Sequence, residues 1–237
     1  MLKKVMRHIL YRMRFVPDEL YLTILYFVEM RQVLDLEKPS SFNEKMQWLK
    51  LHDRNPLYTV LVDKYEVKEW VADRIGREHV LKTYRTWESV SDMSLEGLPE
   101  KFVLKTNHDS GGVAICSDRS SFDLPKSKEL LKKSLNNNYF YNGREWPYKG
   151  VKPLIFAEEY LEPNEGSFGF ADYKLFRFSN GRLITLVCED RIKGLGMSKT
   201  FFDEEWHVLK LSEGGILQTP IILRHSIFGR CANLPTA

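Results

Sequence analysis

The sequence predicts an α+β fold, and three observations support this prediction. The first part of the 237-residue chain has apolar residues at helical spacing, separated by polar breaks. Further along, short apolar runs bounded by turn residues are typical of strands. These runs are joined by tight turns or by intervening helices, and helices followed by hairpins are the usual order of an α+β protein.

The helical part begins with two short helices, predicted within residues 1–36. A third helix is expected next, with Ser40 or Ser41 as its N-cap and Glu44 in the capping-box position. After a break that contains a proline, apolar residues near the helical period predict one helix over residues 57–75.

The strands are predicted from short apolar runs and the turn residues between them. Their ranges are 80–84, 102–105, 113–117, 154–156, 172–178 and 182–190, with a helix over 126–136 and a polar, aromatic loop over 137–148. Asn180-Gly181 favours a two-residue hairpin turn between the last two strands, because both residues tolerate a positive φ.

Composition and charge narrow the range of partners and compartments. The net charge of +3 is too small to indicate a nucleic-acid partner. The cysteines Cys116, Cys188 and Cys231 are odd in number and far apart, which predicts a reducing compartment, no disulfide framework and no cysteine metal site. No apolar run reaches the roughly 18 residues that a membrane span needs. These features predict a cytoplasmic protein.

Residues 1–14 have a composition of their own. They carry five basic residues and no acid, with apolar residues at helical spacing. A basic amphipathic helix of this kind can lie on an anionic surface, which predicts peripheral contact with the inner face of a membrane. The alternative is an N-terminal helix that packs on the rest of the domain.

The stretch from Phe102 to Val113 is the first candidate site. An apolar run leads to Lys105, whose charge is costly there without an anionic partner. The serine and glycines that follow allow backbone N–H groups to approach phosphate oxygens closely. The stretch therefore predicts a triphosphate-binding site; the alternative is an ordinary hairpin with a solvated lysine.

Three more segments are candidates for contact with a nucleotide. Lys64, predicted on a helix, is a second phosphate-binding lysine or a member of an exposed helical ion pair. Residues 158–161 offer backbone groups to an adenine edge, or are a strand end that meets solvent. Asp172 and Lys174 share one face of a strand, where they bind a ribose hydroxyl and a phosphate or form a cross-strand salt bridge.

Arg191 is the candidate catalytic residue, because a guanidinium at a strand end can stabilise charge on a transferring phosphoryl group. The loop Asn142–Tyr148 is either a substrate lid or a segment that packs its aromatic side chains on the domain. The Walker A, dinucleotide-binding and zincin patterns are absent. The Asp-x-Asp pair of many nucleotide-sugar glycosyltransferases is absent as well.

In their order and spacing, these segments resemble the TupA-like ATP-grasp family, which is associated with teichuronopeptide, capsule and other cell-surface polysaccharide biosynthesis. The similarity covers about residues 35–210. The segments that carry it are Ser41–Trp48, Asp53–Tyr58, Val62–Tyr65, Phe102–Lys105, His108–Gly112, Asn142–Tyr148, Glu158–Leu161 and Asp172–Lys174.

The resemblance implies an ATP-grasp fold, in which two α+β subdomains hold ATP between them. It implies an N-terminal helical segment over residues 1–36, a first subdomain over 37–157 and a second over 158–237. The residues that would contact ATP are Lys64 and Lys105 on the phosphates, the mobile loop of His108, Asp109, Ser110, Gly111 and Gly112, the adenine segment of Glu158, Glu159, Tyr160 and Leu161, and Asp172 with Lys174.

The resemblance also implies a chemistry. ATP-grasp enzymes usually activate a carboxylate as an acylphosphate, which an amine then attacks. The acceptor implied here is a uronic acid or an acidic peptide on a glycan. The alternatives are a glycosyltransferase that uses a nucleotide sugar, and a non-catalytic scaffold docked at the membrane.

One feature departs from the family pattern. Members continue past the region of Asp203 into further strands that supply the acidic ligands of Mg²⁺, whereas nothing after Glu213 is acidic here. The expectation is a C-terminally truncated copy that lacks the last strands of the second subdomain and has an incomplete Mg²⁺ site. The metal ligands are not assigned.

Overall fold

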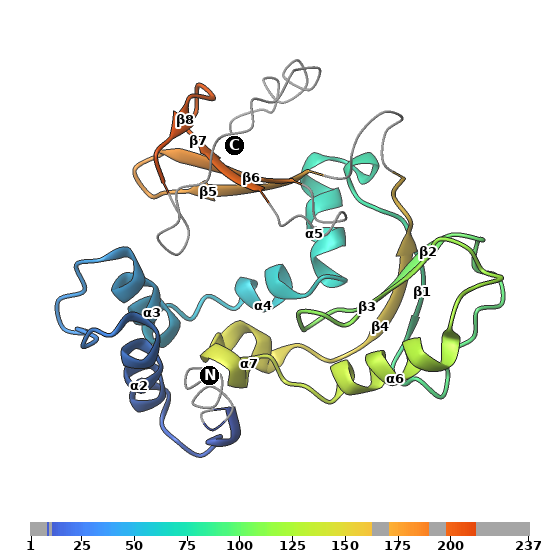
Figure 1. The fold of residues 1–237 in the computed structure, drawn as a ribbon, viewed down its shortest axis with the longest axis horizontal. Coiled ribbons are helices and arrows are strands. Elements are labelled where there is room, and N and C mark those ends of the chain that lie inside the picture. Colours follow the sequence, from blue (N-terminus) through green and yellow to red (C-terminus); the bar gives the residue numbers. More distant parts are fainter. Residues whose placement is uncertain (1–8, 10, 163–170, 190–197, 212–237) are drawn as a thin grey trace. The chain divides into compact units, whose positions relative to one another are not determined.

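The computed structural model describes residues 9, 11–162, 171–189 and 198–211. It is a mixed structure of helices and two four-stranded antiparallel sheets, which confirms the predicted α+β class (Figure 1). The chain divides into two compact units, residues 1–160 and 161–237. The finer division at residues 36 and 157 remains a prediction.

The first unit contains the described helices and one sheet. The helices are α2 (Asp18–Met30), α3 (Phe42–His52), α4 (Leu57–Val62), α5 (Glu66–Ile75), α6 (Leu124–Leu135) and α7 (Phe140–Gly143), with the 3₁₀ helices η1 (Arg77–His79) and η2 (Trp146–Gly150). The strands are β1 (Thr83–Trp87), β2 (Phe102–Thr106), β3 (Val113–Cys116) and β4 (Ile155–Glu159), in the order β1-β4-β2-β3.

The register of the central pair β2–β4 sorts its side chains onto two faces. Leu104 lies opposite Ala157, and this face packs against Leu131 of α6 in the main hydrophobic core. Lys105 lies opposite Phe156, one position along, so it belongs to the other face. The core thus fixes the strand that carries the first candidate lysine.

Helix α3 begins as the sequence predicts. Ser41 is its N-cap and accepts a hydrogen bond from the Glu44 backbone, while the Glu44 carboxylate accepts from the Ser41 backbone, which completes a capping box. These hydrogen bonds to Ser41 are the main reason why the pKa of Glu44 falls to about 2.

The prediction of a single helix over residues 57–75 is wrong, because the chain forms α4 and α5 with a break at Asp63. The Asp63 carboxylate accepts hydrogen bonds from the backbone N–H groups of Tyr65 and Glu66, at 2.8 and 3.1 Å, and so starts a new helix. Lys64 therefore lies in a turn between two helices rather than on a helix surface.

Two strand boundaries also differ from the prediction. The strand expected over residues 80–84 is β1, Thr83–Trp87, and is preceded by η1. Strand β4 extends to Glu159 instead of ending at residue 156, because residues 158 and 159 continue the pairing with β2. Both glutamates therefore belong to the sheet.

The aromatic loop after α6 is packed on the domain, which favours the second of its two interpretations. It contains α7 and η2, and the Trp146 indole donates to the Asp53 carbonyl at 2.7 Å. Arg144 is 1% exposed, lies 4.1 Å from the centre of the Tyr21 ring and donates to the carbonyl of Met13. This loop is thus packed against the N-terminal helical segment around the buried side chain of Arg144.

The second unit contains the other sheet, whose strands are β5 (Asp172–Arg177), β6 (Leu183–Glu189), β7 (Ser198–Phe202) and β8 (Val208–Leu209) in sequential order. A hairpin forms where Asn180-Gly181 predicts one, and Gly181 has a φ of 87°. The prediction of a two-residue turn is wrong, however, because Phe178 donates to the carbonyl of Arg182 and the loop between them is residues 179–181. Strands β7 and β8 were not predicted.

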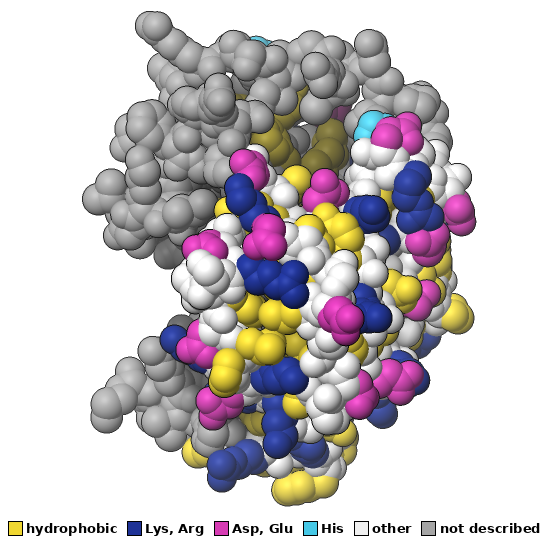
Figure 2. All heavy atoms as spheres, turned by 90° about the vertical axis from the view of Figure 1, so that its right-hand side faces the viewer, with side chains coloured by type: hydrophobic (Ala, Val, Ile, Leu, Met, Phe, Trp, Pro, Cys, Tyr) yellow, Lys and Arg dark blue, Asp and Glu magenta, His cyan; other side chains and the backbone are white. Residues whose placement is uncertain are grey.

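On the face drawn in Figure 2, basic and acidic side chains are interspersed, and neither sign covers a broad area of the described surface. Among the described residues, no helix is long and apolar enough to cross a bilayer. Residues 1–8 and 10 lie outside the described residues, so the membrane-binding helix over residues 1–14 remains a prediction.

Candidate functional site

Lys105 of β2 forms an ion pair with Glu158 of β4 on the face of the sheet opposite the main core. The other carboxylate oxygen of Glu158 accepts from Lys68 of α5 at 2.8 Å. The Glu158 side chain is 4% exposed and that of Lys68 12%, whereas that of Lys105 is 30% exposed. The buried pair of Lys68 and Glu158 therefore holds a lysine whose side chain is still partly exposed.

Lys68 is the residue of this group that sequence reasoning missed. Its ammonium also donates to the carbonyl of Leu81 and the hydroxyl of Thr83, at 3.1 and 3.0 Å, so all three of its protons have acceptors. The only sequence signal was its position four residues after Lys64, which gives no information about a partner 90 residues away.

Lys64 approaches the same region from the turn between α4 and α5. Its ammonium donates to the backbone carbonyl of Asp109, and its backbone N–H donates to the carbonyl of Asn107 at 3.0 Å. Burial lowers the pKa of Lys64, the nearby charge of Lys105 lowers it further, and Asp109 opposes the shift. The two lysines are thus close enough to repel each other, and an anion between them would relieve that repulsion.

Asn107 connects this turn to the loop after β2. It is fully buried, and its amide nitrogen donates to the Asp63 carboxylate at 2.8 Å and to the carbonyl of Lys152 at 3.0 Å. Its amide oxygen accepts from the backbone of Leu154 at 2.9 Å. One buried side chain therefore ties the α4–α5 turn, the loop and the start of β4 together.

The loop after β2 closes through a hydrogen bond from the Thr106 backbone to the carbonyl of Gly112, at 3.0 Å. Gly111 has a φ of +109°, and a Cβ at Gly112 would lie 2.1 Å from the hydroxyl of Ser134. The turn therefore requires glycine at both positions, for different reasons. Within the described part of the chain, the exposed backbone N–H groups of Ser110 and Gly111 have no acceptor.

His108 and Asp109, which belong to the same predicted loop, are 2% and 7% exposed. The His108 ring contacts the carbonyl of Asn137 at 2.9 Å, and Asp109 accepts from Thr106 at 2.7 Å. Burial tends to raise the pKa of Asp109, but hydrogen bonds from Thr106 and Ser134 outweigh it and the pKa is lowered. These two side chains support the loop from within the protein.

The residues of the predicted adenine segment, 158–161, differ in how far they are exposed to solvent. Glu158 is buried in its two ion pairs, whereas Glu159 is exposed, and its backbone donates to the carbonyl of Lys82 at 2.9 Å. Tyr160 is partly buried and ends the first unit, and Leu161, 49% exposed, begins the second. The structure brings Lys64, Lys105 and the loop together with Glu158.

In the second unit, Asp172 and Lys174 are neighbours on one face of β5, and their charged groups are 3.5 Å apart. The pair lies within one strand, whereas the alternative expected from the sequence was a cross-strand salt bridge. Both side chains are exposed enough to meet a ligand. Arg191 lies outside the described residues, as do residues 212–237, where the truncation and the missing Mg²⁺ ligands were expected.

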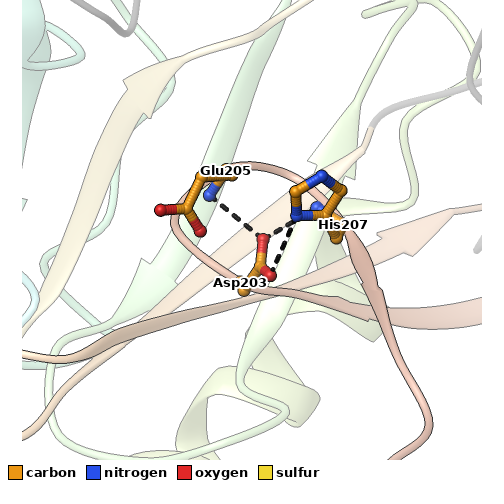
Figure 3. Close-up of side chains that lie close together, drawn as sticks. All are labelled: Asp203, Glu205 and His207. Carbon is orange, nitrogen blue, oxygen red and sulfur yellow. Dashed lines mark hydrogen bonds and ion pairs between the residues drawn. The ribbon is translucent and has the colours of Figure 1, made fainter.

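Asp203, Glu205 and His207 form the one cluster of possible metal ligands among the described residues (Figure 3). The Asp203 carboxylate accepts from the backbone N–H groups of Glu205 and His207 at 3.0 and 2.8 Å, and contacts the His207 ring at 3.2 Å. These hydrogen bonds account for the cluster as a tight turn between β7 and β8.

Comparison with known protein families gives a match over most of the chain. Residues 44–217 match a family model described as TupA-like ATPgrasp. A search of curated proteins found no match, and neither did a search of solved structures.

Proposed function

Because the chain belongs to the TupA-like ATP-grasp family, we propose that it binds ATP and activates a carboxylate as an acylphosphate during the synthesis of a cell-surface polysaccharide. The observation that carries the proposal is the pair Lys64 and Lys105, close enough to affect each other's charge, beside the free N–H groups of Ser110 and Gly111. Ammonium groups and exposed backbone N–H groups are the donors that bind phosphates.

In this proposal Lys105 and Lys64 bind the phosphates of ATP, and the backbone of residues 110–112 covers them. Glu158 and Lys68 are positioning residues, because the buried ion pair holds Lys105 on one side while the Lys105 side chain remains 30% exposed. Within the segment 158–161, Glu158 and Glu159 are paired in the sheet, so Tyr160 and Leu161 are the residues proposed to offer backbone groups to adenine. Asp172 with Lys174 is proposed to contact the ribose and a phosphate.

A carboxylate oxygen of the acceptor attacks the γ-phosphorus of ATP, the bond from that phosphorus to the bridging oxygen breaks, and ADP leaves with that electron pair. An amine then attacks the acyl carbon, phosphate leaves, and the amine nitrogen loses a proton. Lys64 and Lys105 stabilise the negative charge on the transferring group.

Mg²⁺ bound with ATP would neutralise phosphate charge. The described donor set fits the phosphates, since it offers two ammonium groups and free N–H groups, whereas its acidic member, Glu158, is occupied by Lys68 and Lys105. Arg191 is proposed to stabilise phosphoryl charge, and the metal ligands stay unassigned.

Calorimetric titration of the full chain with ATP and Mg²⁺ tests the proposal. We expect saturable binding that weakens about tenfold or more in Lys64→Met and in Lys105→Met, because each removes a charged hydrogen-bond donor. Lys132→Met is the matched control, since Lys132 is an exposed lysine of α6. Thermal unfolding of each variant separates lost binding from lost folding.

Two outcomes contradict the proposal. Absence of ATP binding by the folded wild-type chain would overturn it. A loss of ATP affinity in Lys132→Met equal to the losses in Lys64→Met and Lys105→Met would overturn it as well. Binding of a nucleoside diphosphate sugar in preference to ATP would favour glycosyltransferase chemistry instead.

A further inference from the structure

A cavity of about 670 Å³ lies in the first unit on the α6 side of the glycine loop. Its wall includes the loop residues Ser110, Gly111 and Gly112, and its other lining residues come from α6, the turn that follows it, α7 and the N-terminal segment. The cavity therefore shares the glycine loop with the proposed phosphate site, whereas Lys64, Lys105 and Glu158 do not line it.

The polar groups of the cavity are available for a ligand. Within the described residues, the side chains of Lys133, Asn142 and Ser110 form no hydrogen bond or ion pair, and all three are exposed. The amide oxygen of Asn137 accepts from the Tyr11 hydroxyl at 2.5 Å, which leaves its amide N–H groups for another acceptor. One cation and several uncharged donors thus converge on one space.

The charge of the cavity is positive at its accessible surface. Asp109 also lines it, but this carboxylate is 7% exposed and is occupied by Thr106 and Ser134. Arg14 does not line the cavity, but its guanidinium lies 5.5 Å from the centre of the ring of Tyr11, which does. An anionic group is therefore favoured beside Lys133.

The lining distinguishes among acidic ligands. Side-chain amides and a hydroxyl both donate and accept hydrogen bonds, as sugar hydroxyls do. Lys133 is the single free lysine of the lining, which matches one carboxylate rather than the several of an acidic peptide. The exposed side chain of Leu130 and the ring of Tyr11 supply the apolar contact that a pyranose face uses.

We propose that this cavity binds the acceptor as a sugar acid, with its carboxylate on Lys133 and its hydroxyls on Asn137, Asn142 and Ser110. The identification of this ligand as the acceptor rests on the proposed function, because a sugar acid in the cavity can accept a phosphoryl group only if ATP binds at the neighbouring phosphate site. Binding of a sugar acid itself is measurable without any reaction.

Saturation-transfer NMR with D-glucuronate, and with D-glucose as the neutral counterpart, tests the cavity on the full chain. We expect wild type to bind glucuronate, and Lys133→Ala to weaken it about tenfold, since a charged hydrogen bond is lost. Lys132→Ala is a matched control from the adjacent exposed position of α6, and Lys132 does not line the cavity. Asn142→Asp should weaken binding by repulsion of the carboxylate.

The outcomes separate the two proposals. Glucuronate binding that is absent in the wild type, equal to glucose binding, or unchanged in Lys133→Ala overturns the cavity site, whatever ATP does. Competition between ATP and glucuronate overturns the acceptor assignment, because the cavity would then hold phosphate. Intact glucuronate binding in a folded chain that fails to bind ATP overturns the proposed function and the acceptor role with it.

Discussion

The two faces of the sheet in the first unit consist of the same strands but carry different chemistry. One face presents Leu104 and Ala157 to α6, and both are fully buried. The other presents Lys105 and Glu158, which form an ion pair with each other. Side chains alternate along a strand, so Lys105 follows Leu104 on the opposite face. Packing of Leu104 in the core therefore holds the backbone position of Lys105.

The apolar face should therefore contribute mainly to folding stability, and the charged face mainly to the proposed nucleotide binding. The apolar face is stabilised by the removal of hydrocarbon from water. The charged face contains Glu158, buried between two lysines, and buried charges are tolerated only when they are paired. Substitutions on the two faces should therefore have different effects on nucleotide binding, even where they cost similar free energies of unfolding.

The largest effect is expected from Glu158→Ala. It leaves the Lys68 ammonium, 12% exposed, without its carboxylate, and breaking a buried pair in this way costs about 3–5 kcal/mol of the free energy of unfolding. Denaturant unfolding measures the loss. ATP affinity should fall too, because Lys105 is no longer held by its partner.

The double variant Lys68→Met/Glu158→Leu is the control for this prediction. It removes the buried charges together, so it should recover much of the stability that Glu158→Ala loses. If the double variant is less stable than the single one, the interpretation of Glu158 and Lys68 as a buried charge pair is wrong.

A somewhat smaller loss is expected from Leu104→Ala on the apolar face. The side chain is fully buried in the main core, and removal of such a leucine costs about 2–5 kcal/mol. At a temperature where the variant is folded, its ATP affinity should equal that of the wild type. A large fall in affinity without unfolding would show that the two faces are not separable.

Gly112→Ala should cost about 1–3 kcal/mol by overpacking, because its Cβ would meet Thr106 and Ser134 at 2.4 and 2.1 Å. Gly111→Ala is the matched variant: its Cβ meets nothing within 4 Å, and the cost is the strain of a φ of +109°. Thermal unfolding compares the two. Equal stability of Gly112→Ala and the wild type would contradict the close packing of the loop on α6.

Much of the fold and part of the site follow from local sequence patterns. The capping box of Ser41 and Glu44 and the position of the hairpin at Asn180-Gly181 depend on residues a few positions apart, so the sequence alone predicts them. Lys105 and its loop were recognised for the same reason, because an apolar run, a lysine and two glycines are adjacent in the chain.

The features that were missed depend on distant residues. The break at Asp63 is stabilised by Asn107, 44 residues away, which no helical periodicity reveals. Lys68 pairs with Glu158 across 90 residues, and the same ion pair explains why Glu158 is buried in a strand rather than exposed at its end. Tertiary hydrogen bonds and ion pairs thus decided the details of the site that local patterns left open.

The smallest effect, and the one that depends on pH, is expected from Asp109→Asn. Burial opposes ionisation of Asp109, but hydrogen bonds from Thr106 and Ser134 lower its pKa below that of an unfolded chain. A carboxylate whose folded pKa is depressed contributes stability above the unfolded pKa of about 4, and this contribution is lost as the pH falls through the folded pKa. The wild type should therefore exceed the variant in stability at neutral pH, and the difference should shrink below about pH 4. Urea unfolding of both chains across this range measures it, and a constant difference would show that the stabilising form of Asp109 is not the carboxylate.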